Sequence, residues 1–137
     1  MTRIDFHTGV ADQIGYACRL VRKAYGAGQQ TVVVGEPSML ATLDAALWTF
    51  SSLDFIPHCG VDSRLAAQTP VVLSTSPGRA PHHAVLINLG GVVPEDFARF
   101  ERLLEIVGAT PDAVTAGRDR YRFYRDRGYQ LTNHVAA

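Results

Sequence analysis

The chain has 137 residues, of which 47% are hydrophobic and 19% are charged, and its formal net charge is zero. This composition excludes a disordered chain, and the length predicts a single domain over residues 1–137 with a sizeable core. The longest apolar runs, such as residues 84–87, are too short to cross a bilayer. The N-terminus shows no signal-peptide pattern, so a cytoplasmic protein is expected. The two cysteines, Cys18 and Cys59, lack a C-x-x-C spacing, which favours reduced thiols over a disulfide.

Strand-like and helix-like patterns alternate along the chain. The strand patterns are short apolar runs, as in sheets buried on both faces, and are expected at residues 4–7, 31–34, 71–74, 84–89 and 103–107. The helix patterns are apolar stripes with proline starts or glycine stops, and are expected at residues 10–24, 37–50 and 111–128. Such alternation predicts an α/β fold, a Rossmann-like three-layer domain with a mostly parallel central sheet.

The basic residues are concentrated near the C-terminus. Residues 117–128 hold five of the thirteen lysines and arginines, so this segment carries +3 and the rest of the chain −3. On a helix, Val114, Arg118, Tyr121, Arg122 and Arg125 share one face. Of the five arginines, only Arg122 has an acidic residue three or four positions away. Unpaired arginines beside a tyrosine favour a site for a carboxylate or phosphate, and the alternative is a solvated basic face with its aromatic side chains packed inward.

No motif for catalysis, cofactor or metal binding is found. The turn at residues 8–12 has one glycine where a dinucleotide fingerprint has three, and the turn at residues 35–38 has a glutamate and no lysine. The adjacent pairs His58-Cys59 and His82-His83 lack the spacing of zinc ligands. No serine or cysteine occupies a nucleophile elbow. The sequence therefore predicts no catalytic residue, no metal and no cofactor.

Three blocks, in order, resemble the chi subunit family of bacterial DNA polymerase III. They are LDAALWTF at residues 43–50 with FIPH at 55–58, VLINL at 85–89, and RDRYRFYR at 118–125 with GYQL at 128–131. The resemblance covers essentially the whole chain. It implies a non-catalytic accessory subunit with a Rossmann-like fold and no working nucleotide site. It also implies that the protein binds the acidic C-terminal tail of single-stranded DNA-binding protein and links it to the clamp loader.

The resemblance also implies residues for two binding surfaces. The arginine that clamps the tail falls on Arg118, with Tyr121 and Arg122 in the same site and Val107 on the preceding strand. Arg125 joins this group because it lies on the same helix face. A second surface, for the psi subunit or an accessory repair helicase, is expected at Trp48 and Phe55. The alternative for these two aromatic residues is packing in the core.

Two other functions remain open at the level of sequence. One is a small nucleotide-binding or hydrolytic enzyme that uses the crevice at the strand ends of a Rossmann-like fold. The other is direct binding of single-stranded DNA, with Tyr121, Tyr124 and the arginines as a stacking groove. The acidic remainder of the chain disfavours strong contact with DNA, so we expect contact with DNA to be indirect, and we expect no contact with membranes.

Overall fold

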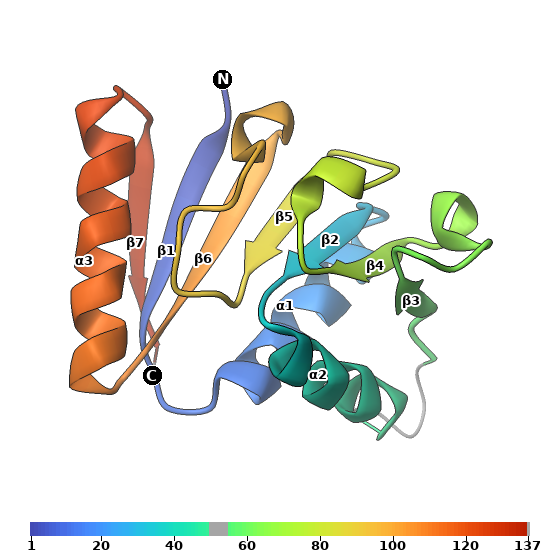
Figure 1. The fold of residues 1–137 in the computed structure, drawn as a ribbon. Coiled ribbons are helices and arrows are strands. Elements are labelled where there is room, and N and C mark those ends of the chain that lie inside the picture. The colour runs from blue at the N-terminus through green and yellow to red at the C-terminus, as the bar shows by residue number, and fades with distance from the viewer. Residues whose placement is uncertain (50–54, 137) are drawn as a thin grey trace.

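A computed structural model describes residues 1–49 and 55–136, which form one seven-stranded sheet with helices on both faces (Figure 1). The strand order is β3-β4-β2-β5-β6-β1-β7, and all pairings between described strands are parallel. The strands are β1 (Arg3–Val10), β2 (Thr31–Val34), β3 (His58–Gly60), β4 (Val71–Ser74), β5 (Val85–Asn88), β6 (Arg102–Gly108) and β7 (Leu131–Val135). The predicted α/β fold class is confirmed.

Three α-helices connect the strands in the described part of the chain. They are α1 (Gln13–Gly26), α2 (Pro37–Thr49) and α3 (Pro111–Asp126), and short 3-10 helices lie at Ala66–Gln68, Pro77–Arg79 and Phe97–Arg99. Side chains cap two helix starts, because Asp12 accepts a hydrogen bond from the Gly15 amide and Thr110 from the Ala113 amide. Gly128 follows α3 with a φ of 82°, as the sequence predicts for a helix stop. Phe50, the end of the predicted second helix, lies outside the described residues.

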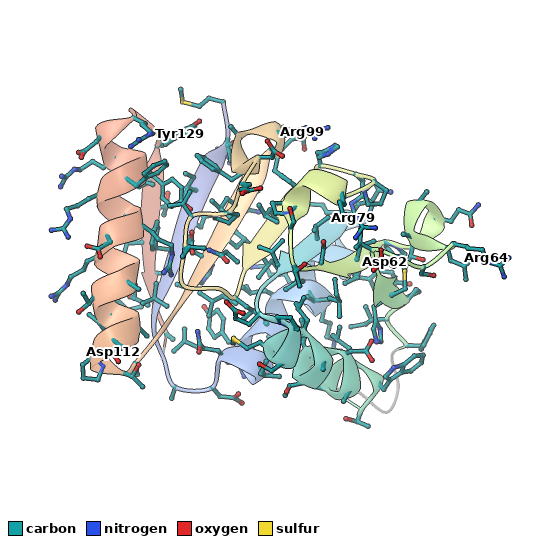
Figure 2. The ribbon with its side chains drawn as sticks, viewed as in Figure 1. Asp62, Arg64, Arg79, Arg99, Asp112 and Tyr129 are labelled. Atoms are coloured by element: carbon teal, nitrogen blue, oxygen red, sulfur yellow. The ribbon has the colours of Figure 1, made fainter. Side chains whose placement is uncertain are left out.

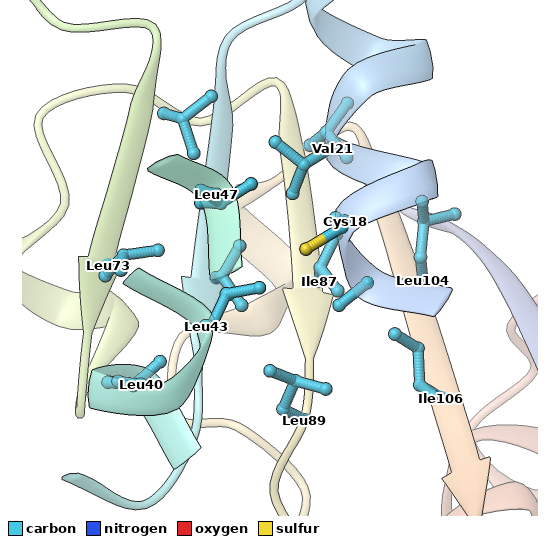
Figure 3. Packing of buried hydrophobic residues seen from close by; sticks show 14 of the residues in the cluster. Cys18, Val21, Leu40, Leu43, Leu47, Leu73, Ile87, Leu89, Leu104 and Ile106 are labelled. Carbon is cyan, nitrogen blue, oxygen red and sulfur yellow. The ribbon is translucent and has the colours of Figure 1, made fainter. Parts of the chain in front are cut away.

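Two apolar clusters lie on opposite faces of the sheet. Helices α1 and α2 cover one face, where Cys18, Val21, Leu43 and Leu47 pack against alternate strand residues such as Ile87 (Figure 3). Helix α3 and the 3-10 helix at Phe97–Arg99 cover the other face. Neighbours in one strand divide between the faces, with Val33 in the first cluster and Val32 in the second. This is the three-layer arrangement expected from continuous apolar strands.

Strands β3 and β7 were not predicted from the sequence. Strand β3 has only three residues, and β7 is a largely exposed edge strand of sequence LTNHV, so neither shows an apolar run. Strand β7 pairs with β1 in register, which places His134 beside His7. The two imidazole rings stack 4.8 Å apart, and His7 Nδ1 lies 2.6 Å from the Tyr16 hydroxyl. Backbone pairing with β1 and the stacked histidine pair therefore hold an edge strand that hydrophobic periodicity cannot reveal.

Helix α3 packs closely on β6 at Gly117. A Cβ atom at this buried position would lie 2.7 Å and 2.9 Å from the two Cγ atoms of Val107 on β6. Real Cβ atoms do not come this close, and the valine is buried and has stiff χ1 preferences, so it cannot easily move away. Glycine inside a helix is usually a weakness, but here it allows the helix to dock.

We therefore expect Gly117→Ala to destabilise the protein, although the same change in an exposed helix interior stabilises by about 1 kcal/mol. Overpacking against Val107 should lower the free energy of unfolding by about 1–3 kcal/mol, measured by urea denaturation. The double variant Gly117→Ala/Val107→Ala should be less destabilised than the sum of the two single variants, because the shorter side chain removes the clash. Stabilisation by Gly117→Ala alone would contradict this account of the helix–sheet contact.

Candidate functional site

A cavity of about 340 Å³ opens beside α3 at the β1 side of the sheet. We call it the α3 pocket. Its walls come from β1, β6, β7 and α3, and its lining residues are Phe6, Thr8, Gly9, Val107, Val114, Gly117, Arg118, Tyr121 and Asn133. Its volume lies at the lower end of the range of pockets that bind small ligands.

The inner wall of the α3 pocket is apolar. Phe6 and Val107 are only 2% and 5% exposed and form part of the second core cluster. Tyr121 is partly buried, and its ring meets the Phe6 ring edge-on at 5.2 Å between centroids. The pocket thus offers an aromatic and aliphatic surface that is already packed and needs little rearrangement to receive an apolar group.

Arg118 provides the charge of the pocket. It is exposed, and its guanidinium makes no hydrogen bond or ion pair with any residue in the described ranges. Guanidinium groups bind carboxylates and phosphates through two parallel N–H···O bonds, and a group without a protein partner keeps its donors for such a ligand. The predicted residues Val107, Arg118 and Tyr121 therefore meet in one cavity, with the cation beside the apolar wall.

Arg122 and Arg125, also predicted for this site, do not line the pocket. Both are exposed on α3, where Arg122 pairs with Asp119 and Arg125 Nη2 lies 3.2 Å from Asp126 Oδ1. Figure 2 shows the outer side of α3, between the labelled Asp112 and Tyr129, with nitrogen-ended side chains extending away from the sheet. The Arg127 guanidinium contacts Phe123 and not an acid: it donates a hydrogen bond to the Phe123 carbonyl and stacks over the Phe123 ring.

Arg120 lies on the inner side of α3 and is 4% exposed. Its Nε donates to Glu105 Oε1 at 2.9 Å, and the Tyr124 hydroxyl donates to Glu105 Oε2 at 2.5 Å. The Asn88 amide donates to both carboxylate oxygens at 3.0 and 3.2 Å. Burial raises the pKa of Glu105, while Arg120 and the donated hydrogen bonds act in the opposite direction. Burial, reinforced by the neighbouring Glu105, also raises the pKa of Tyr124.

This buried cluster corrects two interpretations drawn from sequence. Arg120 is not an unpaired surface arginine, because its acidic partner lies on β6 and not on its own helix. Tyr124 cannot stack on a nucleic-acid base, because it is completely buried and bound to Glu105. A stacking groove built from Tyr121, Tyr124 and the arginines therefore does not exist in this fold.

Four lining residues of the α3 pocket were not identified from the sequence, namely Phe6, Thr8, Gly9 and Asn133. Gly9 has a φ of 68° and sits where the β1–β6 register shifts, so a glycine two residues after a predicted strand was the available signal. Asn133 lies on β7, and its position became visible only once that strand was placed beside β1.

Trp48 and Phe55 lie on the surface. They are 57% and 62% exposed, which excludes core packing as the explanation for either residue. Their rings are 5.4 Å apart, and the Trp48 ring also contacts His58 at 4.8 Å. His58 Nε2 in turn lies 3.2 Å from Asp44 Oδ1 on α2. Helix α2 covers the face of the sheet opposite α3, so this aromatic surface is remote from the α3 pocket.

A larger cavity of about 630 Å³ lies at the carboxyl ends of β2, β4 and β5, where a nucleotide would bind in many α/β proteins. Glu36 and Glu95 line it, and these carboxylates would repel a phosphate chain. The described residues contain no group of three or more side chains arranged to hold a metal ion. None of the described helices is long and apolar enough to span a membrane.

The fold and the pockets define a Rossmann-like α/β protein. Comparison with known proteins identifies its family. The family model described as "DNA polymerase III chi subunit, HolC" matches residues 1–132. The chain is 34% identical to DNA polymerase III subunit chi of Pseudomonas aeruginosa over 139 aligned positions, covering 98% of this chain and 96% of that protein. It is 25% identical to the subunit chi of Haemophilus influenzae, covering 85% of this chain and 82% of that protein. The chain belongs to the chi subunit family of DNA polymerase III.

The Glu105 cluster leads to a stability prediction. Arg120→Met should lower the free energy of unfolding by about 3–5 kcal/mol near neutral pH, because it leaves a buried carboxylate without its cation. Losing the arginine also raises the pKa of Glu105 further in the folded state. The folded variant then binds a proton more readily than the unfolded chain, so the deficit relative to the original protein should shrink as the pH falls from about 7 to about 5.

Arg122→Met is the matched control on the same helix. Its ion pair with Asp119 is exposed, so the loss should stay below about 1 kcal/mol and should depend little on pH. Denaturant unfolding of both variants at several pH values distinguishes the two cases. Equal losses for Arg120→Met and Arg122→Met would contradict a structural role for the buried pair.

Proposed function

We propose that this chi family member binds the acidic C-terminal tail of single-stranded DNA-binding protein in the α3 pocket. By this contact it connects that protein to the clamp loader of DNA polymerase III, as an accessory subunit without catalysis of its own. The observation that carries the proposal is Arg118, an exposed cation without a partner among the described residues, beside an apolar pocket. A chain end with a free carboxylate and an aromatic side chain has the complementary chemistry.

In this proposal, each part of the tail's last residue has its own contact. The terminal carboxylate accepts two hydrogen bonds from the Arg118 guanidinium, a geometry that lysine cannot reproduce. The aromatic side chain enters the pocket against Val107 and Phe6, which are buried already, so binding removes apolar surface from water with little ordering cost. Tyr121 packs on Phe6 and provides the side of the pocket.

Arg122 and Arg125 contribute at longer range. Their ion pairs with Asp119 and Asp126 are solvent-exposed, so each is worth little and can be exchanged for an incoming acid. Acidic residues that precede the last residue of the tail would meet this face of α3, because the face lies next to the α3 pocket. Such contacts raise the association rate and weaken with added salt, whereas the clamp at Arg118 sets most of the affinity.

Trp48 and Phe55 form the proposed surface for a second protein, either the psi subunit or an accessory repair helicase. Large exposed aromatic side chains are typical of interface hot spots. The two residues touch each other and lie on the α2 side of the sheet, so a partner there would not cover the α3 pocket. The protein could therefore hold both partners at once, which is what an adaptor requires.

The central test is the affinity for an acidic peptide that ends in Pro-Phe with a free carboxylate, measured by isothermal titration calorimetry. A charge-assisted hydrogen bond contributes about 1.5–3 kcal/mol, so Arg118→Ala should weaken binding about tenfold or more. Arg118→Lys should restore part of this loss, because a point charge replaces the guanidinium fork. Amidation of the peptide's C-terminus should weaken binding in the same way as Arg118→Ala.

Two controls make this assignment specific. Combining the amidated peptide with Arg118→Ala should cost less than the sum of the separate changes, because both remove one interaction. Arg127→Ala should change the affinity little, because Arg127 is occupied by Phe123 and does not line the pocket. Undiminished binding of the free-carboxylate peptide to folded Arg118→Ala protein would refute the clamp.

The second surface has its own test. Phe55→Ser should leave the peptide affinity and the melting temperature nearly unchanged, because Phe55 is 62% exposed and remote from the α3 pocket. The same variant should lose at least about 1 kcal/mol, or roughly fivefold, in capture of purified psi subunit or helicase. Leu65→Ser is a matched control, since Leu65 is equally exposed at 62%. If both variants bind the partner as the original protein does, the aromatic surface is not the docking site.

A further inference from the structure

Strand β7 joins the sheet through β1, and after the partly buried Leu131 its side chains are exposed. Successive side chains of a strand point to opposite faces of the sheet. Asn133 therefore lines the α3 pocket on one face, while His134 stacks on His7 of β1 on the other. We propose that this stacked histidine pair is a pH-sensitive contact. It holds β7 against β1 near neutral pH and lets the strand, a wall of the α3 pocket, open more often at acidic pH.

The strand register places the two imidazole rings in direct contact. His7 and His134 are paired residues of β1 and β7, and their ring centroids lie 4.8 Å apart at an interplanar angle of 17°. The His134 side chain is 48% exposed, whereas His7 is only 9% exposed. Two positively charged rings at this distance repel each other, and a partly buried site screens that repulsion less than bulk water does. The closed pair therefore holds one proton better than two.

Titratable or charged groups face His7 from its own strand and from its neighbours, and they are Asp5 of β1, Arg102 of β6, Tyr16 and Lys23 of α1, and His134 of β7. The carboxylate of Asp5 is already shared by two of the others. Arg102 donates a hydrogen bond to Asp5 Oδ2, and His134 Nε2 lies 3.7 Å from Asp5 Oδ1. A proton on His7 would thus meet more positive than negative charge.

This environment determines the direction of the pH effect. Burial, followed by the neighbouring His134, lowers the pKa of His7 below the ordinary histidine value. Opening of β7 takes His134 away and gives the His7 ring access to water, so the pKa of His7 returns toward about 6.5. A histidine whose pKa is lower in the closed state favours closure at neutral pH, and this contribution is lost as the pH falls. Below about pH 6.5 the open strand therefore gains population.

Few buried contacts oppose the opening of β7. Leu131 and Ala136, at its two ends, are only partly buried against the two core clusters. Segments with few buried apolar contacts are the first to open locally. Opening would take Asn133 out of the α3 pocket, and a ligand in that pocket would in turn favour the closed strand. This link between β7 and the tail peptide rests on the proposed function, whereas the pH dependence of the strand does not.

The test is amide hydrogen exchange of the full-length protein, followed by NMR and corrected for the intrinsic exchange rate at each pH. Parallel pairing turns alternate amides of β7 toward β1, and the Ala136 amide donates to the Thr8 carbonyl at 2.9 Å. Protection of the His134 and Ala136 amides should fall about threefold or more from about pH 7.5 to about pH 5.5, because proton uptake on opening raises the opening constant. The amide of Val33, in the interior strand β2, should stay protected, because the opening is local.

Three histidine variants make the test specific. His7→Gln removes the titrating ring but keeps a polar group beside Tyr16, so protection of β7 should then change little with pH. His134→Gln removes the second charge at an exposed position, so it should fold and should show a reduced response. His82→Gln is the matched control, because burial also lowers the pKa of His82, which is bound to Thr69 and remote from β7. It should keep the full response.

The proposal is overturned if β7 protection in the original protein does not depend on pH. It is also overturned if His7→Gln or His134→Gln retains the full response, or if His82→Gln abolishes it. Loss of protection at Val33 together with β7 would show global unfolding and would equally overturn a local contact.

The Pro-Phe peptide distinguishes this inference from the proposed function. At a free concentration of about ten times its dissociation constant, the peptide should raise protection of the β7 amides about tenfold, because it binds the closed strand. Bound peptide without added protection would overturn the link between β7 and the α3 pocket. A peptide that calorimetry shows not to bind would refute the proposed function, and the pH dependence of exchange would still decide the role of the histidine pair.

Discussion

The Glu105 carboxylate fixes the position of α3, and the α3 pocket depends on that position. Arg120 and Tyr124 are one helical turn apart and bind the same carboxylate, so the rotation of the helix about its own axis is set by two contacts to one point on β6. Gly117, one turn earlier on the same inward side, lets the helix backbone approach Val107. With these positions turned inward, Arg118 follows about 100° around the helix and stands at the edge of the sheet beside Tyr121.

The two faces of the sheet are packed by different kinds of contact. Beneath α1 and α2 the cluster is built from aliphatic side chains and one cysteine with a few partly buried neighbours, and apolar contacts of that kind tolerate small shifts. Beneath α3 a charged group is buried, and its desolvation has to be offset by Arg120, Tyr124 and Asn88 together. Hydrogen bonds are directional, so this face specifies one placement of the helix. The face with the stricter geometry is the face that carries the α3 pocket.

The sequence predicted the fold class correctly but only part of the candidate site. Apolar periodicity identified every strand with a buried apolar run and all three α-helices, because those patterns reflect burial directly. It missed β3, which is three residues long, and β7, which is exposed and polar. Helical spacing and family resemblance together identified Val107, Arg118 and Tyr121. Phe6 and Asn133 could not be identified, because they reach the pocket only through strand pairing. Arg120 was misjudged for the same reason, since its acidic partner is distant in sequence.

The arginines of α3 carry the same charge but differ in the partner of that charge. Arg120 points inward and anchors the helix through Glu105. Arg122 and Arg125 are exposed and have weak acidic partners. Arg118 lines the α3 pocket and has no partner among the described residues. Two directional contacts to one buried carboxylate disfavour a second position of α3, so a ligand beside the helix is not expected to shift it. Under the proposed function, the protein would thus join its partners by holding two separate surfaces at a fixed distance. The gain in overall affinity would come from a raised effective concentration and not from a conformational change.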